Sequence, residues 1–193
     1  GTMGGAAAWY LHEAGMRVVA LGDAAGTLYD PAGLDVPALL ETRDRYSEID
    51  RSVVPARVQR LDRDAVLGMD VDILVPAAVS YAITAENCTR VTAPVVVEAA
   101  NAATTADAEL DLTARGIAVV PDFVANAGAV AWAWWLILGE VDEQAETSFL
   151  RLSREMVAKV SDLMTGWSPS DGPLRWAADV SDVVRHVPPV VVP

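Results

Sequence analysis

GTMGGAAAWYLHEAGMRVVALGD, residues 1–23, places a glycine-rich helix start ahead of an apolar run that ends in an acid. A helix N-terminus carries unpaired N–H groups and a partial positive charge, and glycine lets a diphosphate approach the backbone. Asp23 follows the next strand, about 20 residues on, where a carboxylate can bind ribose hydroxyls. The stretch indicates the back half of a dinucleotide site. The alternative is a glycine/alanine helix packed on a sheet, with Asp23 as a turn residue.

Apolar runs and helical patterns alternate along the next hundred residues. Continuous apolar runs indicate strands that are covered on both faces, and they occur at 16–23, 72–78, 95–101 and 117–122, with a weaker candidate at 58–61. Helical patterns occupy 2–14, 36–46 and 105–115, and Thr84 marks a further helix start. The alternation predicts an α/β fold of the Rossmann-like, doubly wound kind, with a mostly parallel sheet.

After Gly139 the strand-like runs stop and only helical patterns and loops follow. Residues 140–164 are predicted to form one long amphipathic helix, 168–173 a loop and 174–186 a second helix. We therefore expect a dinucleotide-binding domain at 1–139 and a C-terminal helical segment at 140–193. The most apolar stretch, 123–139, is shorter than the roughly 20 residues of a membrane helix, and we interpret it as a buried helix.

Composition narrows the classes of protein to consider. The chain has 193 residues, of which 52% are hydrophobic, as expected of a globular protein. Its formal net charge of −13 repels phosphate backbones, so no nucleic-acid partner is expected. Cys88 is the only cysteine, which is consistent with a reducing, cytoplasmic setting and predicts a core residue. His12 and His186 lack ligand spacing, so no metal site is expected, and nothing indicates a membrane partner.

Polar or small residues follow each predicted strand, where ligands bind in doubly wound sheets. Asp23 would grip both ribose hydroxyls and repel a 2′-phosphate, which favours NAD over NADP. Asn101 and Asn126 offer neutral donors and acceptors that suit a nicotinamide carboxamide, a ribose hydroxyl or a substrate amino group. The alternative for each asparagine is a helix or turn cap.

Five motifs together resemble the cofactor-binding half of the glutamate/leucine/phenylalanine/valine dehydrogenases. They are GTMGGAAAWYLHEAG, VVALGDAAGTLYDPAGLD, DVDILVPAA, VVVEAANAATT and VPDFVANAGAV, and the resemblance runs from residue 1 to about residue 139. The resemblance implies oxidative deamination of an L-amino acid to a 2-oxo acid, with a hydride passed to a nicotinamide cofactor. It also implies a homo-oligomer.

The resemblance assigns roles to individual positions. Gly1 and Gly4 match the second and third glycines of the Gly-x-Gly-x-x-Gly fingerprint, with Thr2 and Met3 between them, and the first glycine and its strand are expected upstream of residue 1. Asp23 matches the ribose-binding acid. The remaining matches are Ala77, Ala78 and Asn101 along the cofactor, Asn126 near the nicotinamide and the substrate amino group, and Val130 and Ala133 in the substrate pocket.

The chain also departs from the family pattern. Tyr81 stands where the family usually has Asn, and Ala99, Ala103 and Ala129 replace Gly, Pro and Gly. We expect the added methyls of Ala99 and Ala129 to narrow the cofactor approach slightly. Ala133 occupies the position of a serine in glutamate-specific members, which weakens the case for glutamate.

No catalytic residue is expected in this chain. The family's general-base lysine and its partner aspartate belong to an N-terminal substrate domain, and Lys159, the only lysine here, lies in the predicted C-terminal helix. We therefore expect a chain that binds cofactor without turnover and forms part of a longer enzyme. The alternatives are a non-catalytic nucleotide-binding or regulatory module and another Rossmann oxidoreductase, such as a malic-type enzyme.

Overall fold

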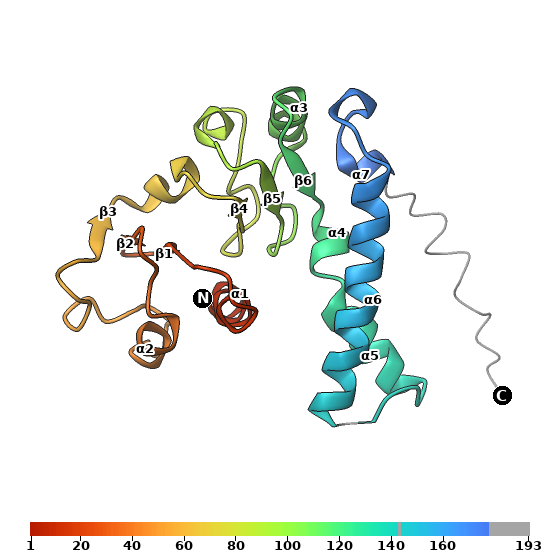
Figure 1. Ribbon diagram of the computed structural model, residues 1–193, viewed down its shortest axis with the longest axis horizontal. Helices are drawn as coiled ribbons and strands as arrows, with labels where there is room; N and C mark the ends of the chain where they lie inside the picture. Colours follow the sequence, from red (N-terminus) through yellow and green to blue (C-terminus); the bar gives the residue numbers. More distant parts are fainter. Residues whose placement is uncertain (143, 178–193) are drawn as a thin grey trace.

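A parallel sheet forms the centre of the protein. The computed structural model describes residues 1–142 and 144–177. Strands β4 (Ile73–Leu74), β5 (Val95–Val97) and β6 (Ala118–Val120) run parallel in the order β4-β5-β6 (Figure 1). Three of the predicted apolar runs thus form one sheet. Leu74, Val96 and Val119 are buried in its core together with Ile83 and Leu112, and Cys88 lies in the same core, as predicted.

The first predicted strand belongs to a second sheet. It is confirmed as β1 (Ala20–Asp23), but it turns back into β2 (Gly26–Tyr29), and β2 pairs with β3 (Gln59–Leu61). Both pairings are antiparallel, so the expected parallel pairing of residues 16–23 is wrong. The turn between the strands is Ala24-Ala25, and it is followed at once by Gly26, whose φ of +132° is a glycine conformation. The weaker candidate at 58–61 is confirmed as β3.

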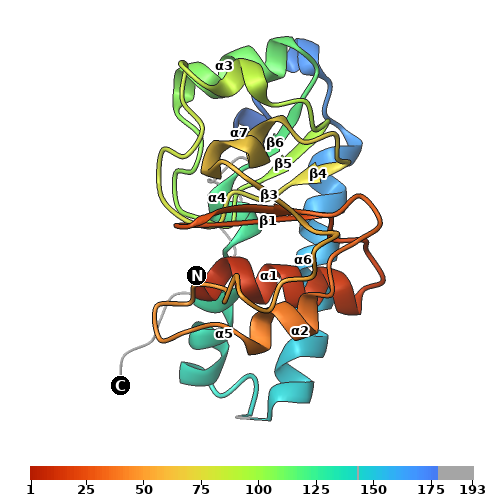
Figure 2. The same cartoon turned by 90° about the vertical axis from the view of Figure 1, so that its left-hand side faces the viewer.

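Helices lie on both sides of the strands, as a doubly wound fold requires. Figure 2 shows α1 (Thr2–Glu13) and α2 (Val36–Glu41) on one side and α3 (Ala106–Ala114) on the other. The Asp35 side chain caps α2 by accepting the Ala38 N–H at 3.1 Å. This helix ends at Glu41, short of the predicted 46. The other short helices on the chain's path between strands are η1 (Arg63–Gly68) and η2 (Cys88–Arg90).

The helix predicted to start at Thr84 is not formed. The Thr84 carbonyl oxygen accepts the N–H groups of Asn87 and Cys88, and the segment then enters the single-turn η2. Asn87 also uses its side chain, which accepts the Thr84 N–H at 2.8 Å and donates to the Ala82 carbonyl. These local side-chain bonds satisfy the backbone without a longer helix.

Helices line one edge of the molecule after β6. They are α4 (Asp122–Ala125), α5 (Gly128–Ile137), α6 (Ala145–Thr165), η3 (Pro169–Asp171) and α7 (Leu174–Ala177) (Figure 1). The predicted long helix is confirmed as α6, which packs against α4 and α5. For the predicted helix at 174–186, only α7 is described, and 178–186 lie outside the described residues. None of the described helices is long and apolar enough to cross a membrane.

The interpretation of 123–139 as a buried helix is wrong. The segment divides into α4 and α5 at Asn126, and α5 has no buried residue. Ile137 is 73% exposed. Two tryptophans of α5 contact side chains of α6. Trp132 Nε1 donates to Ser148 Oγ at 3.0 Å, and the Arg151 guanidinium lies 4.1 Å from the Trp135 ring centre. One side of α5 packs on α6, and its other apolar side chains remain exposed.

Candidate functional site

The first turn of α1 lies against the end of β4. Gly1 precedes the helix, and its carbonyl oxygen accepts the Gly5 N–H at 2.9 Å. The N–H groups of Thr2, Met3 and Gly4 have no acceptor among the described residues. A Cβ at Gly4 would lie 3.6 Å from the Ala77 Cβ. The structure therefore brings two sequence-predicted segments together, residues 1–4 and the Ala77–Ala78 turn.

Two asparagines meet where β5 and β6 end. The Asn126 side-chain Nδ2 donates to Asn101 Oδ1 at 2.7 Å. Asn101 lies in the exposed turn after β5, and Asn126 follows α4, the first helix after β6. The Ala100 N–H donates to the Pro76 carbonyl oxygen at 3.0 Å, which ties the end of β5 to the end of β4. The three parallel strands thus deliver their predicted site residues to one edge.

A buried acid holds these loops in place. Glu98, which is fully buried, accepts the Thr104 N–H at 2.6 Å and the Asp122 N–H at 3.1 Å. Asp122 in turn accepts the Ala102 N–H at 2.7 Å. The turns that carry Asn101 and Asn126 are therefore fixed by carboxylates. The sequence reasoning assigned Glu98 no role, although an acid at the end of an apolar strand is a usable signal.

Arg175 of α7 reaches the same buried acids. It forms ion pairs with Glu98, at 3.3 Å, and with Glu109 of α3. Burial raises the pKa of the Glu109 carboxyl above its ordinary value, against the attraction of Arg175, and the nearby Glu98 adds to the rise. The described C-terminal helix is thereby joined to the loops around the amide pair.

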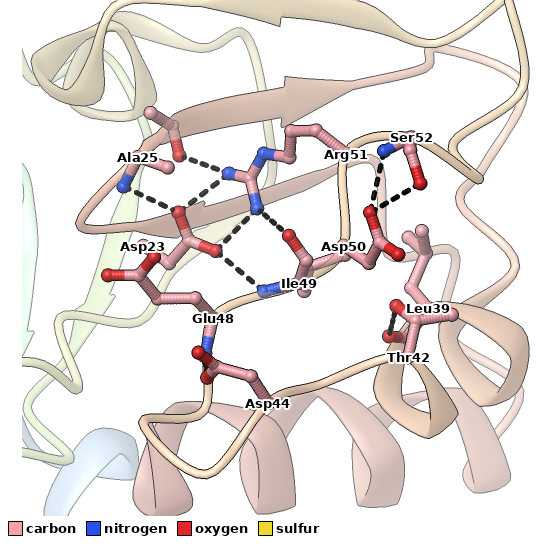
Figure 3. A network of polar contacts seen from close by, with 11 residues as sticks. Asp23, Ala25, Leu39, Thr42, Asp44, Glu48, Ile49, Asp50, Arg51 and Ser52 are labelled. Atoms are coloured by element: carbon pink, nitrogen blue, oxygen red, sulfur yellow. Dashed lines mark hydrogen bonds and ion pairs between the residues drawn. The ribbon is translucent and has the colours of Figure 1, made fainter.

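Asp23 lies at the end of β1 and is ion-paired there (Figure 3). Arg51 binds both carboxylate oxygens, each at 2.6 Å, and the N–H groups of Ala25 and Ile49 donate to one oxygen each. Burial raises the pKa of this carboxyl, but the hydrogen bonds from Arg51, Ile49 and Ala25 outweigh it and hold the pKa below its ordinary value. Asp23 is therefore ionised at neutral pH.

The sequence reasoning missed Arg51. It lies 28 residues after Asp23, in a polar loop that carries no motif. Arg51 is itself anchored, because it donates to the carbonyl oxygens of Ile49 at 3.0 Å and Gly26 at 3.2 Å. The pair joins the β1–β2 turn to the 49–51 loop.

The two predicted substrate residues lie on α5. Val130 and Ala133 are three residues apart, so they share one face of the helix, and both are exposed. No group of three or more metal-ligating side chains occurs in the described part of the chain.

Comparisons with known proteins identify the family. The family model described as Glutamate/Leucine/Phenylalanine/Valine dehydrogenase matches residues 1–185. The catabolic NAD-specific glutamate dehydrogenase RocG of Bacillus subtilis is 42% identical over 135 residues, which are 70% of this chain and 31% of that protein. An NAD-specific glutamate dehydrogenase of Staphylococcus aureus is 40% identical over 70% of this chain and 32% of its own length.

A solved structure agrees with the sequence relatives. The hetero-hexameric glutamate dehydrogenase of Thermus thermophilus, in its Leu-bound form, superposes with a TM-score of 0.75 and 28% identity over 92% of this chain and 42% of its own. The glutamate dehydrogenase of Peptoniphilus asaccharolyticus shares the fold, with a TM-score of 0.65 at 22% identity over 96% of this chain and 45% of its own. The chain, which spans 31% of the length of RocG, belongs to the glutamate/leucine/phenylalanine/valine dehydrogenase family.

Proposed function

We propose that this chain binds NAD at the carboxyl ends of β4, β5 and β6 and serves as the cofactor-binding part of an L-amino acid dehydrogenase. The observation that carries the proposal is the convergence of unpartnered N–H groups at the start of α1 with the strand ends that bear Ala77 and Asn101. Anions bind at such helix starts, and dinucleotides bind at such strand ends. The relatives named NAD-specific support the choice of NAD over NADP.

The start of α1 and the two asparagines have separate roles in this proposal. The N–H groups of Thr2, Met3 and Gly4 would hold the diphosphate, and Gly1 and Gly4 would leave room for it. The bond to Asn101 commits Asn126 Nδ2 and leaves Asn126 Oδ1 without a donor among the described residues. That oxygen is suited to accept from a nicotinamide carboxamide or a substrate amino group. Bound NAD would supply the hydride acceptor for oxidation of the amino acid.

The substrate is an amino acid and its 2-oxo acid. Val130 and Ala133 would face it from α5, and the small apolar side chain at 133 favours an apolar amino acid over glutamate. Lys159 is exposed on α6, and we assign no catalytic residue to this chain. We further propose a cytoplasmic homo-oligomer, in which residues outside this chain supply the general base.

Titration with NADH, followed by quenching of tryptophan fluorescence, tests the proposal. Gly4→Asp places a carboxylate at the helix start, where it suits the helix dipole but competes with a diphosphate. Its Cβ meets only Ala77, at an ordinary contact distance, so the fold should tolerate it. We expect Gly4→Asp to weaken NADH binding at least about tenfold, which corresponds to roughly 1.4 kcal/mol.

Gly166→Asp is the matched control, because Gly166 follows α6 and a Cβ there meets nothing within 4 Å. It should bind NADH like the wild type. Wild-type protein that shows no saturable quenching would refute the proposed function. Equal affinities for the wild type and Gly4→Asp would place the nucleotide elsewhere.

A further inference from the structure

The acid expected to bind the adenine ribose has its oxygens already engaged. Oδ1 of Asp23 accepts from Arg51 and the Ala25 N–H, and Oδ2 accepts from Arg51 and the Ile49 N–H. A carboxylate has about four lone-pair positions, and four donors fill them here. A ribose diol would have to displace or share one of these donors, and Arg51 is the one that is not fixed in the backbone.

The negative charge of Asp23 is also balanced by the positive charge of Arg51. A lone Asp23 would repel a 2′-phosphate, which is the physical basis for preferring NAD to NADP. Arg51 cancels that charge across a two-point contact at 2.6 Å. The Arg51 side chain is 20% exposed and that of Asp23 only 8%, so the cation is the more accessible member of the pair.

The loop that leads to Arg51 is strongly acidic, so Arg51 largely determines the charge around Asp23. Residues 44–50 contain Asp44, Glu48 and Asp50, and Figure 3 shows all three in the loop that leads to Arg51. The only other cation of this loop, Arg45, lies over the Tyr46 ring, 4.7 Å from its centre. Removing Arg51 would leave Asp23 beside a strongly acidic loop.

We propose that Arg51 is a specificity-determining residue of the dinucleotide site, which reduces the preference for NAD over NADP by neutralising the charge of Asp23 beside the 2′-position. The inference rests on the proposed function, because it requires a dinucleotide whose adenine ribose reaches the end of β1. It makes Arg51, rather than Asp23 alone, the residue that sets the ratio of the two affinities.

The test compares Arg51→Gln with the wild type in calorimetric titrations of the 193-residue chain with NADH and with NADPH. We expect the ratio of the Kd for NADPH to the Kd for NADH to rise by roughly tenfold or more, since one unit charge changes beside the 2′-position. Arg154→Gln on α6 is the control, because it removes the same charge from a side chain that is 77% exposed and pairs only with Glu155 among the described residues. Its ratio should equal that of the wild type.

Arg51→Lys separates charge from structure. Lysine keeps the positive charge but cannot bridge both oxygens of Asp23 and two carbonyls at once. We expect its Kd ratio to stay near the wild-type value. If Arg51 served only to hold the loop, Arg51→Lys would instead behave like Arg51→Gln, and the proposal would be wrong.

The remaining outcomes are distinct. A ratio that is unchanged or lower in Arg51→Gln, with both dinucleotides still bound, overturns the role of Arg51 and leaves the proposed function standing. Wild-type protein that binds neither dinucleotide overturns the proposed function, and the role of Arg51 with it. Thermal unfolding of each variant shows whether a changed ratio comes from folded protein.

Discussion

The contacts of Asp23 include residues that lie far from it in the sequence. Its place at the end of an apolar run predicted a strand end correctly, because a continuous apolar run favours a strand. Its ion pair with Arg51 could not be predicted, since the contact depends on how a distant polar loop folds back onto the β1–β2 turn. The same holds for Glu98, whose three partners come from three separate segments.

Asp23→Asn should destabilise the protein, because it leaves the largely buried Arg51 guanidinium without its anion. We expect a loss of about 1–3 kcal/mol in the free energy of unfolding, measured by urea denaturation. Asp64→Asn is the control, since the Asp64 side chain is 61% exposed in its pair with Arg63 and should contribute nothing measurable. Equal losses in the two variants would show that the Asp23–Arg51 pair contributes no more to stability than an exposed surface pair.

Glu109 should make stability fall as the pH rises. Burial raises the pKa of its carboxyl in the folded state above the ordinary 4.5. Between that ordinary value and the raised one, the unfolded chain releases the proton while the folded protein keeps it, so ionisation favours unfolding. Below the ordinary pKa both states hold the proton, and the penalty is absent.

Glu109→Gln removes this titration. The free energy of unfolding of the variant, minus that of the wild type, should therefore increase from about pH 4 to about pH 7. Urea denaturation at the two pH values measures it, and titrating groups that do not interact with Glu109 cancel in the difference. A difference that stays constant, or decreases, would mean that Arg175 fully compensates the buried charge.

Helices and strands were predicted best where the hydrophobic pattern of the sequence is strong. They were predicted worst where a short turn without typical turn residues reverses the chain. The parallel strands and α6 follow directly from continuous and amphipathic patterns. The β1–β2 hairpin was missed because its turn, Ala24-Ala25, contains none of the residues that usually mark a hairpin, and only Gly26 signals it. The exposure of α5 was missed because its composition resembles that of a buried helix.

Gly26→Ala should break the hairpin. The backbone φ of +132° disfavours any side chain, and a Cβ would lie 2.7 Å from the Leu61 carbonyl oxygen of β3. We expect a loss of at least about 2 kcal/mol in the free energy of unfolding.

Gly166→Ala makes the same chemical change at a position with right-handed backbone and open space. It should alter stability by less than about 1 kcal/mol, in either direction. Calorimetric melting of both variants measures the contrast. Comparable melting temperatures for the two variants would show that the β1–β2 hairpin accommodates a side chain at residue 26 without loss of stability.

At the scale of the whole molecule, Arg175 connects the C-terminal helix to the core of the parallel sheet. Its pairs with Glu98 and Glu109 join α7 to α3 and to the residue that follows β5, and Glu98 also holds the loops of the amide pair. The connection spans 77 residues of sequence between Arg175 and Glu98, which no local pattern encodes. The parallel sheet with its covering helices, in contrast, was predicted from the alternation of strands and helices alone.

Arg175→Met should therefore be costly, because it leaves two buried carboxylates without their cation. We expect a loss of about 2–4 kcal/mol by urea denaturation, discounted for the partial exposure of the arginine. Arg154→Met, from an exposed surface pair, is the control and should change little. A small loss in Arg175→Met would mean that the buried acids do not depend on the Arg175 cation.

The central claim is that a dinucleotide binds along the edge where β4, β5 and β6 end. The most direct measurement is a crystal structure of the protein grown with NAD. The account predicts the diphosphate at the N–H groups of Thr2, Met3 and Gly4, and the nicotinamide beside the Asn101–Asn126 pair. A dinucleotide bound away from both groups, or a structure without bound nucleotide at saturating NAD, would contradict it.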